Sequence, residues 1–121
     1  MKVKDLMSAD AIKYCTPETR LANAARLMKE NNRGALPVVD DSHKVVGIIT
    51  DRDICLTIGE KADKKIPELN VRDILKHAKV HTVSAEQPLT DALRTMRTNR
   101  IGRLPVTDKE GKLKGMLSIN N

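Results

Sequence analysis

Two short phrases in the sequence carry the side chains best suited to chemistry. The first, "GIITDRD", ends at Asp53, and the second, "GMLSINN", ends at Asn121. In each phrase a hydroxyl stands three positions before a hydrogen-bonding side chain: Thr50 before Asp53, and Ser118 before Asn121. Asn121 is neutral where Asp53 is an anion, and charge-assisted hydrogen bonds are roughly twice as strong as neutral ones. If such phrases hold a ligand, we therefore expect one strong site at the first and one weak or empty site at the second.

Two interpretations of the first phrase are open. In one, it is a capping box, because Thr50 can cap a helix while Asp53 reaches back, and the negative charge suits the helix dipole. In the other, the helix N-terminus lies at the lip of a cleft and offers free N–H groups to a phosphate. A fixed carboxylate there can also accept the hydroxyls of a ribose. The sequence alone does not choose between them.

The two phrases belong to an internal repeat. A shift of 68 positions lays residues 3–53 onto residues 71–121 without a gap. The densest match is "LPVVD" against "LPVTD", and it is flanked by identical residues along most of the length. A match of this kind indicates two copies of one structural unit.

The same helix is expected in each copy. Apolar residues recur at helical spacing in both, which predicts one buried helix face per copy. We expect Pro88 to be a first helical residue, and Gly34 and Gly102 to close the helices in a left-handed conformation. The apolar faces are Leu21, Ala24, Ala25 and Met28 in the first copy, and Leu89, Ala92, Leu93 and Met96 in the second.

Short strands complete each unit. The runs "ALPVV" and "VVGIIT", and later "RLPV" and "LKGMLS", flank polar turns and predict two hairpins. A short strand is expected before each helix, near residues 13–16 and 81–84. After the first hairpin, "DRDICLTIG" predicts a helix closed by Gly59. We therefore expect repeats over residues 1–60 and 71–121, a charged linker over residues 61–70, no last helix in the second repeat, and two equivalent clefts between the units.

The charge balance favours an anionic partner. The chain holds 22 lysines and arginines against 16 aspartates and glutamates, a formal net charge of +6. Tyr14 is its only aromatic residue, so the aromatic side chains that stack on RNA or single-stranded bases are missing, and we do not expect nucleic acid as a partner. A basic ladder fits three interpretations: a solvated helix face, a nucleic-acid patch or phosphate capture near a cleft. Its members are Arg94, Arg97, Arg100 and Arg103.

No enzyme or metal site is expected. The spacing of His43, His77 and His81 matches no metal site, and no nucleophile elbow is present. Without an export signal or an apolar run of membrane-spanning length, we expect a cytoplasmic protein with no membrane segment. Cys15 and Cys55 could form a disulfide, but without an export signal we expect them to be reduced, semi-buried thiols.

The repeated unit, with "LPVVD" and "GIITDRD" in register in two copies, resembles a tandem pair of CBS domains, also called a Bateman module. The resemblance covers essentially the whole chain. It implies an α+β fold of two quasi-symmetric β-α-β-β-α repeats packed as one module. It also implies a non-enzymatic regulator without a required cofactor, which binds AMP, ADP, ATP, S-adenosylmethionine or NAD and reports to an effector protein. Two modules are expected to pair into a homodimeric disc.

The resemblance also implies the site residues. Thr50 and Asp53 would hold ribose and phosphate in one cleft, and Ser118 and Asn121 would do so in the other. The first phrase would face Ser84, Leu89, Ile101, Gly102 and Arg103, with Arg103 as the phosphate ligand. The second would face Thr16, Leu21, Arg33 and Gly34. The alternative function is a structural pairing module that dimerises and binds no ligand.

Overall fold

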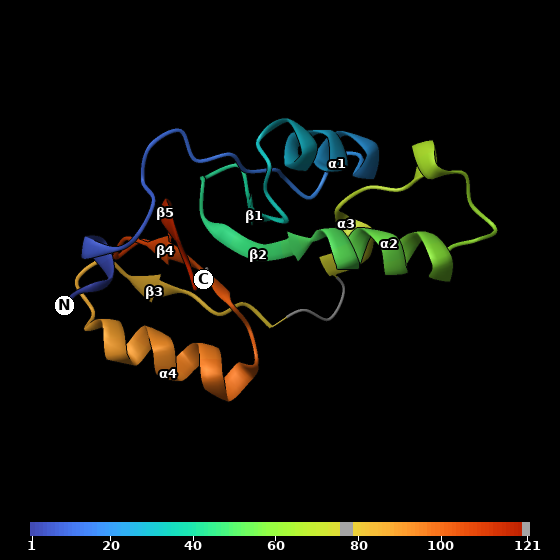
Figure 1. Cartoon of the computed structure of the whole chain (residues 1–121). Coiled ribbons are helices and arrows are strands. Elements are labelled where there is room, and N and C mark those ends of the chain that lie inside the picture. The colour runs from blue at the N-terminus through green and yellow to red at the C-terminus, as the bar shows by residue number, and fades with distance from the viewer. Residues whose placement is uncertain (76–78, 120–121) are drawn as a thin grey trace.

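Two small sheets, one from each repeat, form the centre of the molecule (Figure 1). The computed structural model describes residues 1–75 and 79–119. Short 3-10 turns lie at Val3–Asp5 (η1) and Ile66–Glu68 (η2). The helices are α1 (Leu21–Glu30), α2 (Asp51–Glu60), α3 (Arg72–Leu75) and α4 (Leu89–Asn99). The strands are β1 (Ala35–Val39), β2 (Val45–Thr50), β3 (Val83–Ser84), β4 (Arg103–Thr107) and β5 (Leu113–Ser118).

The two sheets repeat each other in register. Strands β1 and β2 form an antiparallel hairpin, as do β4 and β5, and β3 adds a parallel strand beside β4. In the first sheet Cys15 makes a single parallel bridge to Val38, at the place where Val83 pairs with Val106 in the second. Both hairpins shift register at the same point. The α+β fold of two quasi-symmetric repeats is thus confirmed, although the short strand expected over residues 13–16 is reduced to one bridge.

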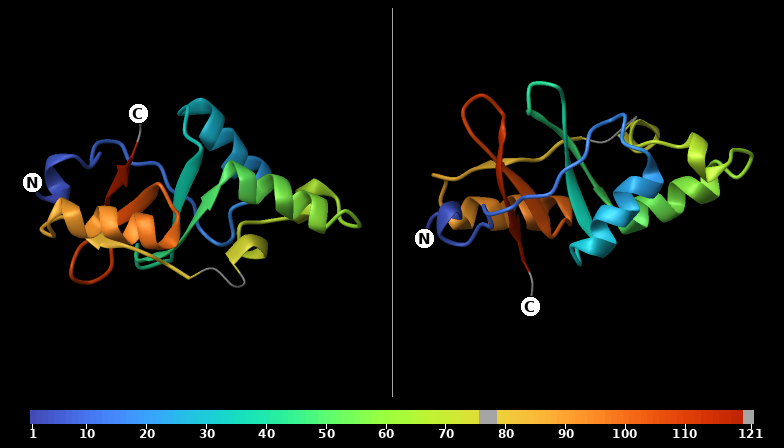
Figure 2. Two further views of the ribbon diagram at one scale, coloured as in Figure 1. Left: turned by 60° about the horizontal axis from the view of Figure 1, so that its bottom comes forward. Right: turned by 90° about the horizontal axis from the view of Figure 1, so that it is seen from above.

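The tips of the two hairpins join the repeats. The N–H of Val45 donates to the carbonyl of Gly111 at 2.9 Å, and the N–H of Leu113 donates to the carbonyl of His43 at 3.1 Å. Figure 2 shows the two turns side by side, with α1 and α2 flanking one hairpin and α4 the other. These bonds align the two sheets across the quasi-symmetry axis.

The left-handed residues after α1 and α4 are not the glycines expected from the sequence. Asn32 has φ 50° and Arg100 has φ 55°, whereas Gly34 and Gly102 have no positive φ. In both repeats the chain leaves the helix before it reaches the glycine. Each glycine lies beside the residue that follows the hairpin. The carbonyl of Gly34 accepts from Asp51 N–H at 3.1 Å, and that of Gly102 accepts from Ile119 N–H at 2.9 Å. The expectation of glycine caps is therefore wrong.

Two helix boundaries also differ from expectation. Pro88 has an extended ψ of 141° and is the N-cap of α4, because it pairs as an isolated bridge with Lys2 instead of entering the helix. Gly59 lies inside α2, which continues to Glu60 and is closed by the N–H of Lys61 on the carbonyl of Thr57.

Each repeat has its own apolar core, and the chain exchanges segments between them. Val3, in η1 at the start of the chain, is buried in the second core with Val83 and Leu104. Leu69 and Val71 are buried in the first core. Figure 1 shows the N-terminal segment beginning in the second repeat, where Lys2 pairs with Pro88, and then crossing to α1. Half of the chain therefore cannot complete a core without the other half, as expected for units this small.

The exchanged segments are held by matching hydrogen bonds. The N–H of Val3 donates to the carbonyl of Gln87 at 2.9 Å, and the N–H of Val71 donates to that of Thr19 at 2.8 Å. Asp73 accepts from the N–H of Asn70 at 2.9 Å, and Asp5 does the same for Lys2 at 2.8 Å. The quasi-symmetry thus extends to segments that the repeat pattern alone does not place.

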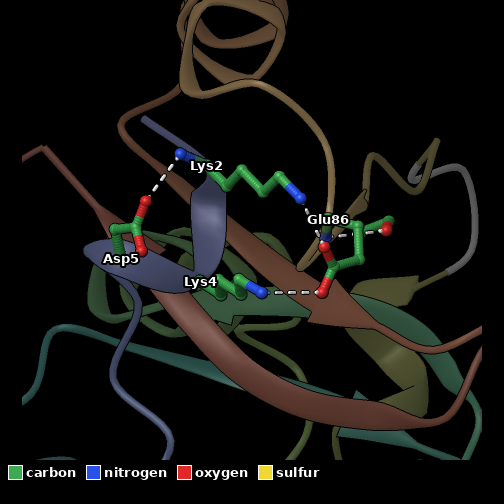
Figure 3. Close-up of polar contacts among 5 residues, drawn as sticks. Lys2, Lys4, Asp5 and Glu86 are labelled. Atoms are coloured by element: carbon green, nitrogen blue, oxygen red, sulfur yellow. Dashed lines mark hydrogen bonds and ion pairs between the residues drawn. The ribbon is translucent and has the colours of Figure 1, made fainter.

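A surface ion-pair cluster fixes the N-terminal segment, as Figure 3 shows. The Nζ atoms of Lys2 and Lys4 lie 2.9 Å and 3.2 Å from the carboxylate oxygens of Glu86. Hydrogen bonds from Lys2 and then Lys4 hold the pKa of the Glu86 carboxyl below its ordinary value of 4.5. At the corresponding place in the other repeat, Arg72 pairs with Glu18.

We expect Glu86→Gln to lower stability at neutral pH. Because the folded-state pKa of Glu86 is depressed, its contribution is present above its unfolded value and is lost as pH falls through the folded value. The deficit of the variant should therefore be largest near pH 7 and disappear in acid, when urea midpoints are compared between pH 2.5 and 7. Glu68→Gln is the control, since Glu68 is exposed and makes no ion pair within residues 1–75 and 79–119. Parallel pH profiles for the two variants would contradict the prediction.

Candidate functional site

A cavity of about 280 Å³ lies between the two repeats. This volume is close to the lower limit of about 300 Å³ for small-molecule sites. Its first-repeat wall consists of residues 31–37, from the end of α1 into β1, and its second-repeat wall consists of Arg103, Met116 and Ser118. Ser8 and residues 10–13 form a third wall. A molecule bound here would contact both repeats and the segment that connects them.

The third wall belongs to residues 8–15, which cross from one sheet to the other and which we call the N-terminal strap. Ser8 donates its N–H to the carbonyl of Met116 at 2.8 Å and accepts from the N–H of Met116 at 2.9 Å. Cys15 donates its N–H to the carbonyl of Pro37 at 3.0 Å. The strap is therefore anchored on β5 at one end and on β1 at the other. Between these anchors Ala11 adopts φ 51°, which turns the chain around the cavity.

Three basic side chains and one acidic side chain line the cavity. Lys13 and Arg33 are exposed to solvent, and Arg103 is half-buried. A Cβ atom added to Gly34 would lie 3.7 Å from Nη2 of Arg103 and 3.6 Å from Oδ2 of Asp51, so the guanidinium lies over this glycine near the start of α2. Asp10 is the acidic lining residue.

The first phrase forms the capping box expected from its sequence. The N–H of Asp53 donates to Thr50 Oγ1 at 3.1 Å, and the N–H of Thr50 donates to Asp53 Oδ2 at 2.9 Å. This confirms the structural interpretation of the phrase. Neither residue lines the cavity described above, which lies on the side of the second phrase. The ligand role of Thr50 and Asp53 stays a prediction.

The cavity gathers four of the expected site residues. Arg33, Gly34 and Ser118 belong to the expected second set, and Arg103, expected opposite the first phrase, lies with them. Asn121 is outside the described residues. Sequence reasoning missed the strap and Met116. Lys13 is the first residue of the strand expected over residues 13–16, but nothing in the sequence pattern placed the strap on β5.

The remaining expected residues do not line this cavity. Leu21 is 1% exposed and belongs to the first core, while Leu89 and Ile101 pack against the second. Thr16 donates its N–H to Thr19 Oγ1, and Ser84 donates its N–H to Gln87 Oε1. Gly102 binds the end of β5 through its carbonyl, as described above.

Quasi-symmetry predicts a second cleft at the first phrase. Shifting the lining residues by 68 positions carries Ser118 onto Thr50, Met116 onto Ile48 and Gly34 onto Gly102. The counterparts of Ser8 and Asp10 are residues 76 and 78, which the structure does not describe. The described part of the chain therefore shows one cavity between the repeats, and its counterpart at the first phrase stays a prediction.

The two cysteines differ in environment. Cys15 is buried and its thiol lies 3.8 Å from the carbonyl oxygen of Pro37; burial raises the pKa of this thiol to about 12. Cys55 is exposed on α2, so the expectation that both are semi-buried is wrong, while both are free thiols as expected.

Within residues 1–75 and 79–119 no cluster of histidine, cysteine and acidic groups could hold a metal ion. In the same part of the chain, no helix has the length and apolar character needed to cross a membrane.

Curated relatives resemble the chain over nearly its whole length. YlbB of Bacillus subtilis is 38% identical over 121 residues, which cover 99% of this chain and 78% of YlbB. The inosine-5'-monophosphate dehydrogenase of Aquifex aeolicus is 32% identical over 124 residues. That alignment covers 99% of this chain but 24% of the enzyme, so the chain spans about a quarter of the dehydrogenase.

Solved structures share the fold. CBSX2 of Arabidopsis thaliana, in complex with AMP, has a TM-score of 0.82 and 30% identity, covering 98% of this chain and 90% of CBSX2. The CBS domain pair of MJ0100, in complex with 5'-methylthioadenosine and S-adenosyl-L-methionine, has a TM-score of 0.79 and 27% identity, covering 98% and 89%. The sequence profile of the CBS domain matches residues 3–60 and 71–121. The chain therefore belongs to the CBS domain family.

Proposed function

We propose that this chain is a non-enzymatic regulatory module that binds an adenosine-containing ligand between its two repeats and signals to a partner protein. The observation that carries the proposal is the cavity whose walls come from both repeats and from the strap. The complexes of CBSX2 with AMP and of MJ0100 with S-adenosyl-L-methionine support the ligand class. AMP, ADP, ATP, S-adenosylmethionine and NAD are all candidates.

The location of the cavity gives a mechanism for regulation. A ligand that touches Arg33 on one repeat and Ser118 on the other binds more tightly to the arrangement of repeats that presents both. It shifts the protein towards that arrangement by as much as its affinities for the two states differ. A partner protein that contacts both repeats, or a second copy of the module, would sense the change. We include pairing of two copies in the proposal because tandem CBS modules often pair.

The proposed ligand contacts lie in two clefts, with Asp53 in the first and Ser118 in the second. In the first, Oδ2 of Asp53 caps α2, and the remaining acceptor capacity of the carboxylate binds the ribose hydroxyls. In the second, the hydroxyl of Ser118 stands at the end of β5 on the cavity wall. The proposed phosphate ligand is Arg103, which lies over Gly34 between the repeats.

Thermal unfolding against the candidate ligands tests the proposal. A ligand at about 100 times its Kd should stabilise the protein by about 2.7 kcal/mol. Loss of the shift in Ser118→Ala would assign the ligand to the described cavity, and loss in Asp53→Ala would assign it to the other cleft. Since Asp53→Ala also removes a helix cap, Asp73→Ala is its control, because Asp73 makes the same capping bond to Asn70 N–H.

The same experiment can reject the proposal. A wild-type protein whose unfolding temperature is unchanged by every candidate ligand at millimolar concentration would argue against a ligand module. If sedimentation then shows a stable dimer that is equally insensitive to these compounds, the structural pairing module becomes the better description. Activity as an adenosine-ligand hydrolase, followed by chromatography of the nucleotide, would contradict the non-enzymatic part.

A further inference from the structure

The basic side chains of the cavity converge from three separate segments. Lys13 comes from the strap, Arg33 from the turn after α1, and Arg103 from the first position of β4. Asp10 supplies a single opposing charge among the lining residues. The cavity therefore has an excess of positive charge at the point where the two repeats meet.

These three cations form no ion pair with a described carboxylate, although the Asp51 carboxylate approaches the same face of Gly34 as the Arg103 guanidinium. In residues 1–75 and 79–119, the ion pairs use other cations, such as Lys2 and Lys4 with Glu86, and none includes Lys13, Arg33 or Arg103. Like charges gathered at one cleft raise the local potential and attract an anion. An anionic ligand would supply the missing partner.

The repeat itself does not require these cations. At the corresponding positions of the other copy, Lys13 is replaced by His81, Arg33 by Ile101 and Arg103 by Ala35. Each pair occupies the same place in the repeated unit, so the unit folds with or without a lysine or arginine there. The charges at this cavity are therefore available for a ligand and are not needed to build the wall.

We propose that this cavity selects an adenosine ligand that carries a chain of two or more phosphates, in preference to adenosine itself or to a cationic sulfonium ligand. The inference rests on the proposed adenosine function and specifies the ligand class for one of its clefts. Arg103, half-buried over Gly34, contacts the phosphate nearest the nucleoside. The exposed Lys13 and Arg33 reach the outer phosphates at the mouth of the cavity. A guanidinium suits this role because its donors match phosphate geometry.

Titration calorimetry of the full chain provides the test, with ATP, ADP, AMP, adenosine, S-adenosylmethionine and inorganic tripolyphosphate as probes. We expect affinity to fall in the order ATP, ADP, AMP, adenosine, and S-adenosylmethionine to bind no more tightly than adenosine. Arg103→Gln should weaken ATP about tenfold or more, as expected for a lost hydrogen bond to a charged group, and leave adenosine within about twofold. Raising the salt concentration should compress the difference between ATP and adenosine, since screening weakens exposed charge pairs.

Matched variants separate the cavity from general surface charge. Lys13→Gln and Arg33→Gln should each weaken ATP more than ADP. Arg26→Gln, which removes an exposed arginine of α1 outside the cavity, should leave every affinity unchanged. If Arg26→Gln weakens ATP as much as Arg103→Gln does, the proposed selectivity of the cavity is wrong.

Failure of this inference and failure of the proposed function give different results. Adenosine or S-adenosylmethionine binding as tightly as ATP, with all the basic-residue variants silent, would overturn phosphate selection and leave the adenosine function standing. Tripolyphosphate binding as tightly as ATP would overturn the adenosine function while phosphate recognition stands. Absence of binding by every probe would overturn both.

Discussion

Replacing Leu69 by alanine is expected to destabilise the protein by about 2–5 kcal/mol, the range for leucine truncation in a well-packed core. Leu69 stands in a stretch whose charge and proline content predict a solvated connector. In the structure it is 1% exposed and packs in the first core with Leu21 and Val71. Its carbonyl also accepts from the N–H of Leu21 at 3.1 Å, which ties the connector to the start of α1.

Urea unfolding of Leu69→Ala measures this directly. The midpoint should fall with little change in the denaturant slope, since the surface exposed on unfolding is nearly the same. Ile66→Ala is the matched control, because Ile66 belongs to the same connector and is 46% exposed; its effect should stay within about 0.5 kcal/mol. Equal and small effects of both substitutions would mean that the connector is not part of the first core.

The Leu69 position shows which part of the fold can be predicted from the sequence. Helical spacing from Leu21 to Met28 predicts α1, and the apolar runs on either side of a polar turn predict the hairpin of β1 and β2, because both patterns are local. Burial of Leu69 depends on a contact with residues far away in the chain. Because the residues around Leu69 are mostly charged, their composition predicts an exposed connector. A single leucine does not change that prediction.

The helix caps also show that local contacts can be predicted from the sequence and long-range contacts cannot. Thr50 and Asp53 form the capping box because both partners lie within one turn of helix, where sequence spacing fixes their distance. The glycine caps failed because Asn32 and Arg100 tolerate the left-handed conformation that was assigned to glycine. The carbonyls of Gly34 and Gly102 instead accept a hydrogen bond from an N–H just after each hairpin. The sequence patterns that predict helix ends do not include this contact.

The residues of the candidate site also differ in whether the sequence could predict them. Arg33, Gly34, Arg103 and Ser118 were identified because the repeat and the family resemblance assign them to clefts, and the structure gathers them around one cavity. Lys13 was not identified, since the strap that carries it is placed by pairing with Met116, more than a hundred positions along the chain. Prediction of the strap requires knowledge that the copies exchange their first segments.

Gly115→Ala is expected to destabilise the protein by about 1–3 kcal/mol, the usual range for overpacking a core. A Cβ atom at this position of β5 would lie 2.7 Å from the carbonyl oxygen of Ser8 and 3.3 Å from Sδ of Met7. Ser8 cannot retreat freely, because its N–H and carbonyl both bond to Met116. The substitution should therefore push the strap off β5, lower the urea midpoint and weaken the ligand bound in the cavity.

Two further glycines make this prediction a graded series. At Gly47 the added Cβ would meet Cδ2 of Leu75 at 2.6 Å, the flexible end of a side chain, so Gly47→Ala should cost less than Gly115→Ala. At Gly59, inside α2, nothing lies within 4 Å, and alanine should stabilise the helix by about 0.5–1 kcal/mol. Affinity for a ligand in the described cavity should change in Gly115→Ala alone, since of these three glycines only Gly115 supports the strap. If Gly115→Ala is as stable as the wild type, the anchoring of the strap on β5 is wrong, and the third wall of the cavity with it.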